Sequence, residues 1–203
     1  MTIDEIMRAA PVIPVLVLNG EVDPVELAET LVDAGLPVLE VTLRTPGALD
    51  AIRAMNAVPG AIVGAGTVLN EVQLAQAIDA GSRFIVSPGL TNPLALAVRD
   101  AGIPYLPGVA TAADIMRGLD LGLSRFKFFP AEASGGIAAL KALSAPLAEA
   151  RFCPTGGVRP ETAADWLAVS SVLCVGGTWF IRPGESNLGQ VTERARAAAA
   201  LKR

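Results

Sequence analysis

Short runs of apolar and β-branched residues recur along the chain, and each is followed by a longer stretch in which apolar residues repeat every three or four positions. The short runs predict strands, and the longer stretches, rich in alanine and leucine, predict amphipathic helices. Successive strand starts are roughly 20 to 26 residues apart, the length of a compact strand-plus-helix unit with short loops. The expected strands begin near Val12, Val38, Ala61, Arg83, Tyr105, Arg125, Arg151 and Ser171.

Eight strand-plus-helix units in series predict a parallel sheet, and eight parallel strands close into a barrel. The expected fold is therefore α/β, a (β/α)8 TIM barrel in a single domain over residues 1–203, preceded by a short N-terminal helix from Thr2 to Ala9. A closing helix is expected from Gln190 to Arg203. Capping residues support the helices: Asp23-Pro24, Asn70 with Gln73 as a capping box, Asn92-Pro93, and Thr111 with Asp114.

One strand carries a lysine among aromatic residues, in the stretch from Arg125 to Pro130. Alternation places Lys127 and Phe129 on one face and Phe126 and Phe128 on the other, which is a core face. A buried ammonium is costly, so such a lysine tends to lose its proton and become a nucleophilic amine. The alternative is a lysine whose stem packs on the core while its head reaches water.

Composition narrows the function further. The net charge of −4 and the pI near 4.9 argue against a nucleic-acid or anionic-membrane surface. The chain has no histidine, so His-based triads and the usual His-ligated metal sites are excluded, and any acid–base work must fall to Glu, Asp, Lys, Tyr or water. Cys153 and Cys174, in apolar segments, are expected to be reduced core residues of a cytoplasmic protein. The apolar run Ala9 to Leu18 contains two prolines and predicts a strand, not a signal peptide or membrane span.

Polar residues interrupt the apolar runs where the predicted strands end, the edge at which barrels place their active sites. Among them, Glu40 shares a strand face with Thr42 and Arg44, and burial would partly desolvate its carboxylate. With Lys127 it would supply a nucleophilic amine and a proton shuttle, the minimum set for Schiff-base chemistry. The alternative is that Glu40 only neutralises Arg44 or Lys127 as a buried ion pair.

Two glycine pairs follow the seventh and eighth predicted strands, Gly156-Gly157 and Gly176-Gly177. Loops at these places commonly bind phosphate in barrels, and Thr178 could add a hydroxyl, although tight turns need glycine in any case. Arg44 and Thr67 would then be available for a second anion such as a substrate carboxylate.

Six motifs, in order and with compatible spacings, resemble those of the bacterial 2-keto-3-deoxy-6-phosphogluconate (KDPG) aldolases, which also act on 4-hydroxy-2-oxoglutarate (KHG). The resemblance runs from about the first strand through the eighth. The motifs are Leu39-Glu40-Val41-Thr42-Leu43-Arg44-Thr45, Gly64-Ala65-Gly66-Thr67-Val68-Leu69, Ser87-Pro88-Gly89, Lys127-Phe128-Phe129-Pro130-Ala131-Glu132, Cys153-Pro154-Thr155-Gly156-Gly157 and Val175-Gly176-Gly177.

The resemblance implies a metal-free class I aldolase of the Entner–Doudoroff pathway, usually a homotrimer, that needs no external cofactor and takes a 2-keto acid and a phosphorylated aldehyde. Lys127 would form the Schiff base and Glu40 would be the general acid–base. A well-known member has serine at the position of Thr178, so the hydroxyl is kept while the added methyl group could narrow substrate choice. The implied binding roles are pyruvate carboxylate for Arg44 and Thr67, pocket shape for Pro88 and Phe129, aldehyde stereochemistry for Thr155, and phosphate for Gly156, Gly157, Gly176, Gly177 and Thr178.

Two other functions remain open at this point. A sugar-phosphate epimerase or isomerase would share the phosphate-binding barrel, but such enzymes usually need a histidine or a carboxylate–metal set. A non-catalytic barrel serving as an oligomeric scaffold is the second alternative, although both proposed catalytic residues are present.

Overall fold

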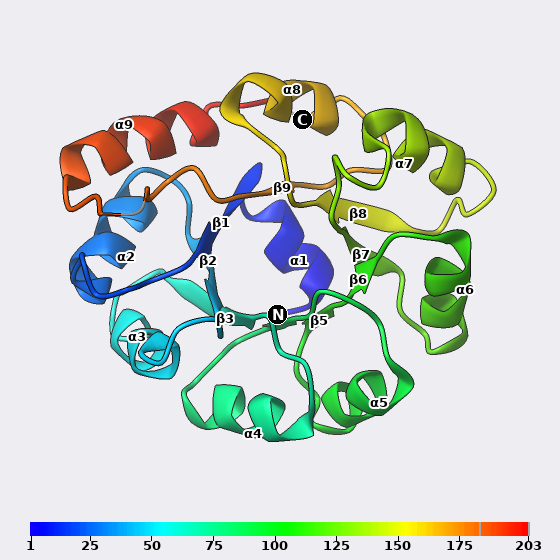
Figure 1. Ribbon diagram of the computed structural model, residues 1–203, viewed down its shortest axis with the longest axis horizontal. Coiled ribbons are helices and arrows are strands. Elements are labelled where there is room, and N and C mark those ends of the chain that lie inside the picture. The colour runs from blue at the N-terminus through cyan, green and yellow to red at the C-terminus, as the bar shows by residue number, and fades with distance from the viewer. Residues whose placement is uncertain (183, 203) are drawn as a thin grey trace.

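Strands and helices alternate along the computed structural model, which describes residues 1–182 and 184–202, as the hydrophobic pattern predicts (Figure 1). The first strand begins at Val12 as expected, whereas the last begins at Val175, later than Ser171, because residue 172 makes only an isolated bridge. The helices are α1 (Ile3–Arg8), α2 (Pro24–Asp33), α3 (Ala48–Met55), α4 (Glu71–Asp79), α5 (Asn92–Asp100), α6 (Ala112–Asp120), α7 (Gly136–Ser144), α8 (Pro160–Leu167) and α9 (Leu188–Ala199). The strands are β1 (Val12–Leu16), β2 (Val38–Thr42), β3 (Ile62–Gly66), β4 (Ile85–Val86), β5 (Tyr105–Leu106), β6 (Gly108–Val109), β7 (Arg125–Phe128), β8 (Arg151–Pro154) and β9 (Val175–Gly177).

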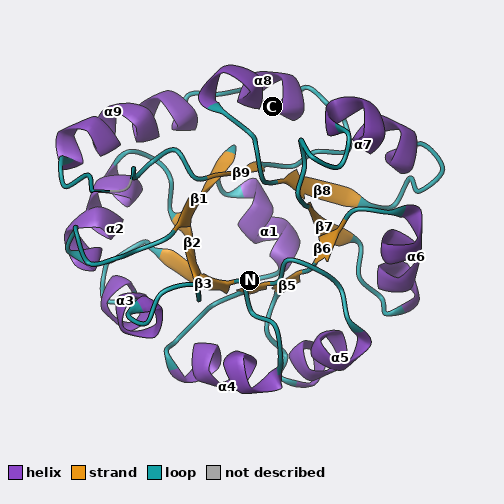
Figure 2. Ribbon diagram, in the orientation of Figure 1, coloured by secondary structure: helices purple, strands orange, loops and turns teal. Residues whose placement is uncertain are grey.

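All strand pairs are parallel, and they form two curled sheets. The larger sheet has the order β5-β4-β3-β2-β1-β9 and the smaller has the order β6-β7-β8. Figure 2 shows the strands inside the surrounding helices. The architecture is therefore α/β with a curled parallel sheet, which directs the carboxyl ends of its strands to one side of the molecule.

Two of the four predicted caps form as expected, and two differ. At α5 the capping position is Thr91 and not Asn92, which is the first residue of the helix, and Thr91 makes no side-chain capping bond. Asp23 accepts hydrogen bonds from two backbone N–H groups of α2, and Thr111 and Asp114 form the reciprocal box at α6. At α4 the side chain of Asn70 accepts from the N–H of Gln73, but the Gln73 side chain accepts from the N–H of Leu69 at 2.8 Å. In the predicted box the Gln73 side chain would accept from the N–H of Asn70, so this second hydrogen bond is displaced by one residue.

The terminal helices differ in how closely they follow the prediction. α1 lies within the expected range and begins with a complete capping box between Thr2 and Glu5. α9 begins two residues before Gln190, because the side chain of Asn187 caps it, and ends at Ala199. Arg203, the predicted end of this helix, lies outside the described residues.

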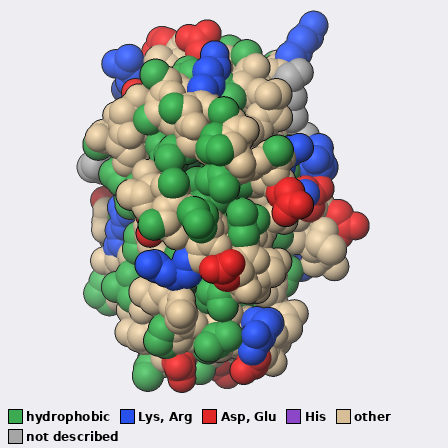
Figure 3. Space-filling model, turned by 90° about the vertical axis from the view of Figure 1, so that its right-hand side faces the viewer, with side chains coloured by type: hydrophobic (Ala, Val, Ile, Leu, Met, Phe, Trp, Pro, Cys, Tyr) green, Lys and Arg blue, Asp and Glu red, His purple; other side chains and the backbone are tan. Residues whose placement is uncertain are grey.

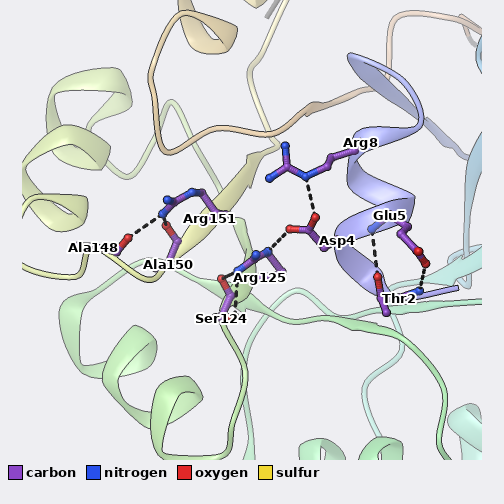
Figure 4. A network of polar contacts seen from close by, with 9 residues as sticks. All are labelled: Thr2, Asp4, Glu5, Arg8, Ser124, Arg125, Ala148, Ala150 and Arg151. Carbon is purple, nitrogen blue, oxygen red and sulfur yellow. Dashed lines mark hydrogen bonds and ion pairs between the residues drawn. The ribbon is translucent and has the colours of Figure 1, made fainter.

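α1 lies across the amino-terminal ends of the strands and is tied to β7 by an ion-pair network (Figure 4). The carboxylate of Asp4 accepts hydrogen bonds from Nε of Arg8 at 2.6 Å and from Nε of Arg125 at 2.5 Å. Arg125 is the first residue of β7. Burial acts to raise the pKa of Asp4, but the hydrogen bonds from the two arginines outweigh it and hold the pKa below the usual 3.8. The contact fixes α1 beneath the strand that carries Lys127.

Two apolar clusters occupy the interior. The larger lies between strands and helices and contains Phe126 and Phe128, as the alternation along β7 predicts. The smaller, the inner cluster, consists mainly of strand residues and includes two residues of α1. Its residues are Ile6, Met7, Ile13, Val38, Ile62, Phe84, Val86, Leu106, Cys153, Leu173 and Cys174. Within the described part of the chain, no helix is long and apolar enough to cross a membrane.

Candidate active site

Lys127 and Glu40 form a buried pair above the inner cluster. The Nζ atom of Lys127 donates to Oε1 of Glu40 at 2.9 Å, and the two side chains are only 6% and 3% exposed. Each is the third residue of its strand, β7 and β2. The burial rules out the alternative in which the lysine head reaches water. The ion pair considered for Glu40 does form, with Lys127 as its partner, and it brings an amine and a carboxylate within one hydrogen bond.

Glycine on the neighbouring strand makes room for this carboxylate. Glu40 pairs with Gly64 across β2 and β3. A Cβ atom on Gly66, two residues along β3, would lie 2.3 Å from Oε1 of Glu40. Sequence reasoning did not single out Gly66 for this role, although a glycine inside a strand is a known sign of close approach by another group.

An aromatic ring lies beside the lysine amine. The ring centroid of Phe129 lies 5.3 Å from Lys127 Nζ, so the cation can interact with the ring face. Phe129 continues β7 beyond its last paired residue, since its N–H donates to Val109 at 3.1 Å, and the Phe129–Pro130 peptide is cis. Cys153 is the partner of Lys127 in the β7–β8 register.

Thr155 reaches the interior immediately after β8. It is 3% exposed, and its Oγ1 donates to the carbonyl of Cys153 at 3.3 Å. A Cβ atom on Gly176 would lie 2.3 Å from that hydroxyl oxygen, and the two residues form an isolated parallel bridge. Gly176 therefore leaves room for Thr155, the residue expected to influence the stereochemistry of the aldehyde. The sequence did not indicate this steric role for Gly176.

The two glycine pairs occupy different kinds of backbone. Gly156 and Gly157 form the loop after β8, with φ angles of +94° and +85° that residues other than glycine rarely adopt. Gly176 and Gly177 instead lie within β9 and pair with β1, so the loop begins only at Thr178. Their expected place in a loop is therefore wrong, because the β1 ladder extends through both residues.

The predicted carboxylate-binding residues meet at the edge of β2 and β3. Arg44 is exposed, and its Nε donates to Thr67 Oγ1 at 3.3 Å. Thr67 has φ +60°, a left-handed conformation that is unusual for a β-branched residue and concentrates at functional sites. The pair presents a guanidinium and a hydroxyl on the side of the molecule where the strands end.

Pro88 is held in a tight turn between β4 and α5. The hydroxyl of Ser87 donates to the carbonyl of Gly89 at 2.7 Å and lies 2.7 Å from the hydroxyl of Tyr105. A Cβ atom on Gly108 would meet the Pro88 carbonyl oxygen at 2.1 Å. Burial raises the pKa of Tyr105 to about 12, although its hydrogen bond with Ser87 acts in the opposite direction.

Thr178 stands apart from the buried centre. It is exposed and lines a 320 Å³ cavity between the end of β1 and the segment after β9. Leu16 and Arg182 also line this cavity. Over residues 1–182 and 184–202, no three His, Cys, Asp or Glu side chains are grouped so that they could hold a metal ion; the absence of a metal from the reaction stays a prediction.

Comparison with known proteins relates this geometry to one family. A family model described as "Aldolase: KDPG and KHG aldolase" matches residues 3–194. The chain is similar to the 2-dehydro-3-deoxy-phosphogluconate aldolase of Zymomonas mobilis, with 54% identity over 201 residues, 99% of this chain and 97% of the relative. It is also similar to the KHG/KDPG aldolase of Escherichia coli K12, with 49% identity over 199 residues, 96% of this chain and 93% of the relative.

A solved structure extends the similarity to three dimensions. It is the KDPG aldolase of Legionella pneumophila with pyruvate captured at low pH as a covalent carbinolamine intermediate. The two chains share 41% identity and a TM-score of 0.94 over 98% of this chain and 99% of the other. The chain belongs to the KDPG and KHG aldolase family.

Proposed function

We propose that the chain is a class I aldolase that reversibly cleaves KDPG to pyruvate and glyceraldehyde 3-phosphate, and KHG to pyruvate and glyoxylate. The observation that carries the proposal is the buried 2.9 Å contact between Lys127 Nζ and Glu40 Oε1. A desolvated amine beside a carboxylate can form a Schiff base, because the carboxylate can move the protons that each step requires.

The reaction begins when Lys127 passes a proton to Glu40 across their 2.9 Å contact, and the resulting neutral amine attacks the C2 ketone. Glu40 shuttles protons as the carbinolamine forms and loses water to give an iminium. Glu40, through a water molecule, then removes the C4 hydroxyl proton. The electrons of the C3–C4 bond move into the iminium, which releases the aldehyde and leaves an enamine. Protonation of the enamine at C3 by Glu40 and hydrolysis of the iminium return the Lys127 amine and release pyruvate.

The remaining residues bind the two halves of the substrate. Arg44 and Thr67 hold the pyruvate carboxylate, a role supported by their mutual hydrogen bond at the edge of the site. Phe129 and Pro88 shape the pocket, and Thr155 orients the aldehyde half. The phosphate is taken by the Gly156–Gly157 loop with Gly176, Gly177 and Thr178.

Borohydride reduction in the presence of pyruvate, followed by peptide mass mapping, tests the proposal. We expect a pyruvate-sized adduct on Lys127 and none on Lys141 or Lys202. An unmodified Lys127 in folded protein would instead favour an isomerase or a non-catalytic scaffold.

We further propose that the two curled sheets are parts of one (β/α)8 barrel within a single aldolase domain over residues 1–203. β5 and β6 are separated only by Pro107, whose carbonyl accepts from the N–H of Lys127 at 2.8 Å. Between β8 and β9, isolated bridges join Phe152 to Val172 and Thr155 to Gly176. These contacts support closure at both places where the regular ladders stop.

A homotrimer is the oligomeric state that we propose. Hydrophobic side chains gather across the middle of the face at the right of Figure 1 (Figure 3). Large exposed apolar residues such as Met116 on α6, 57% exposed, suit burial against another copy. Light scattering after size exclusion should give three times the chain mass of 20.8 kDa; a mass equal to one chain would exclude the trimer.

The cytoplasm is the compartment that we propose for the enzyme. Both cysteines lie in the inner apolar cluster, an arrangement that suits reduced thiols in a reducing compartment. Fractionation of the source cells with an antibody to the chain tests this, and recovery from a secreted fraction would contradict it.

A further inference from the structure

Glu132 connects three elements around the glycine loop after β8. It lies four residues after the Phe128 end of β7, and its backbone N–H donates to the carbonyl of Gly156 at 3.1 Å. Its Oε1 accepts from Nε1 of Trp166 on α8 at 3.1 Å. Trp166 is fully buried and packs near Phe128, with ring centroids 6.3 Å apart. One side chain therefore joins the segment after Lys127 to the helix that follows the loop.

The side chain of Glu132 also lies directly against the loop. A Cβ atom on Gly157 would lie 2.6 Å from Cγ of Glu132, so the two residues are in close contact. A Cβ atom on Gly136, the first residue of α7, would lie 3.5 Å from Oε2. A carboxylate at a helix amino terminus is favoured by the helix dipole. Oε1 is therefore held by the indole and Oε2 lies near the start of α7, although the residue as a whole is exposed.

Backbone hydrogen bonds connect the segment around Glu132 to the loop that contains Gly156 and Gly157. The N–H of Ala131 donates to the carbonyl of Thr155 at 2.8 Å, and the next donor along the chain is Glu132 itself. These bonds extend the β7–β8 pairing beyond the regular strands, into the loop with two consecutive positive φ angles. Glycine loops of this kind have little side-chain packing of their own to fix their position. Contacts from outside the loop must therefore hold it.

We infer that Glu132, through Trp166, is a positioning residue that sets the place of the Gly156–Gly157 loop relative to Lys127. The inference rests on the proposed function, in which this loop takes the substrate phosphate. Glu132 does not touch the reacting atoms. Its loss should weaken binding of a phosphorylated substrate and leave chemistry that needs only pyruvate, Lys127 and Glu40 unchanged.

The test compares two reactions of the same purified protein: cleavage of KDPG, and exchange of the pyruvate methyl protons in D2O. For Glu132→Ala we expect KM for KDPG to rise about tenfold, the size of effect that follows from one lost hydrogen bond to a charged group, with pyruvate exchange within twofold of wild type. Glu132→Gln keeps an acceptor for the indole and should remain within threefold for both reactions. Glu149→Ala, an exposed acidic residue before β8, is the matched control.

A second variant checks the route through the indole. Trp166→Phe keeps an aromatic ring beside Phe128 but removes the donor, so it should raise KM for KDPG as Glu132→Ala does. The double variant Glu132→Ala/Trp166→Phe should be no worse than the more affected single variant, because both remove the same contact. Additive losses would contradict a shared contact.

The remaining outcomes are distinct. Equal losses in KDPG cleavage and pyruvate exchange would show a general structural role and overturn the inference, as would wild-type kinetics in Glu132→Ala or an equal defect in Glu132→Gln. Failure of the proposed function has a different signature, since the wild-type protein itself would then show neither KDPG cleavage nor pyruvate exchange.

Discussion

A Cβ atom at position 66 would lie 2.3 Å from Oε1 of Glu40, so the carboxylate keeps its position only because β3 carries glycine there. Gly66→Ala should force Glu40 away from Lys127 Nζ. We expect a loss of at least about 100-fold in pyruvate proton exchange, comparable to the removal of a general acid–base. Steady-state exchange in D2O measures the effect directly.

Gly64→Ala is the matched control on the same strand. Its added Cβ would lie 2.4 Å from the ring of Phe84 in the inner cluster, not from Glu40. Both variants should be destabilised by about 1 to 3 kcal/mol through overpacking, as measured by denaturant unfolding. Comparable exchange rates in the two variants would show that the loss in Gly66→Ala comes from general destabilisation.

Removing one member of the buried ion pair should affect both activity and stability. Lys127→Met leaves the carboxylate of Glu40 without its partner at 3% exposure, and breaking such a pair costs about 3 to 5 kcal/mol. The double variant Lys127→Met/Glu40→Leu removes both charges and should recover most of the free energy of unfolding. Neither variant should form a borohydride-trapped pyruvate adduct. Turnover in Lys127→Met close to that of wild type would exclude the Schiff-base mechanism.

The location of much of this candidate site was predictable because strand alternation and strand-end position are local properties of the sequence. Lys127 and Glu40 are each surrounded by apolar neighbours, and both residues prove to be buried on the inner face. The helix caps at Asp23 and Thr111 depend on residues only two or three positions apart, which explains why they could be identified. Residues 71–79 form a helix as expected, with only the second arm of its cap displaced.

The parts that could not be predicted depend on contacts between distant segments. The closeness of Gly66 to Glu40 and of Gly176 to Thr155 follows from the register of neighbouring strands, which no single stretch of sequence encodes. The sequence predicted Gly176 and Gly177 in a loop because glycine is common in turns, but pairing with β1 keeps them in a strand. The positive φ of Thr67 is likewise imposed by its surroundings.

The left-handed conformation of Thr67 predicts an opposition between stability and activity. Its backbone is fixed by the N–H of Val68, which donates to the carbonyl of Val86 at 3.1 Å. A strained residue of this kind costs about 1 to 3 kcal/mol, and glycine relieves most of that cost. Thr67→Gly should therefore raise the free energy of unfolding by about 1 kcal/mol after the greater freedom of the unfolded chain is included.

The same change removes the hydroxyl that accepts from Arg44 Nε. We expect KM for pyruvate in the exchange reaction to rise about tenfold in Thr67→Gly. Thr67→Ser keeps the hydroxyl and should remain within about threefold of wild type. Unfolding titrations and exchange kinetics on the three proteins decide the matter. A Thr67→Gly protein less stable than wild type would show that the conformation is not strained.

Tyr105 gives the fold a predictable weakness at high pH. It is the one tyrosine of the chain, is 4% exposed, and its pKa is raised by burial from the usual 10.0 to about 12. Because the folded-state pKa exceeds the unfolded one, its contribution to stability is complete below pH 10 and is lost as the pH rises through about 12. The loss should total about 2 to 3 kcal/mol.

Denaturant unfolding of wild type across this pH range measures the loss, with Tyr105→Phe as the control that cannot ionise. The phenolate absorbance of the wild-type protein reports the same ionisation directly. Titration near pH 10 in the folded protein, with equal pH dependence in the two proteins, would show that the hydroxyl reaches water.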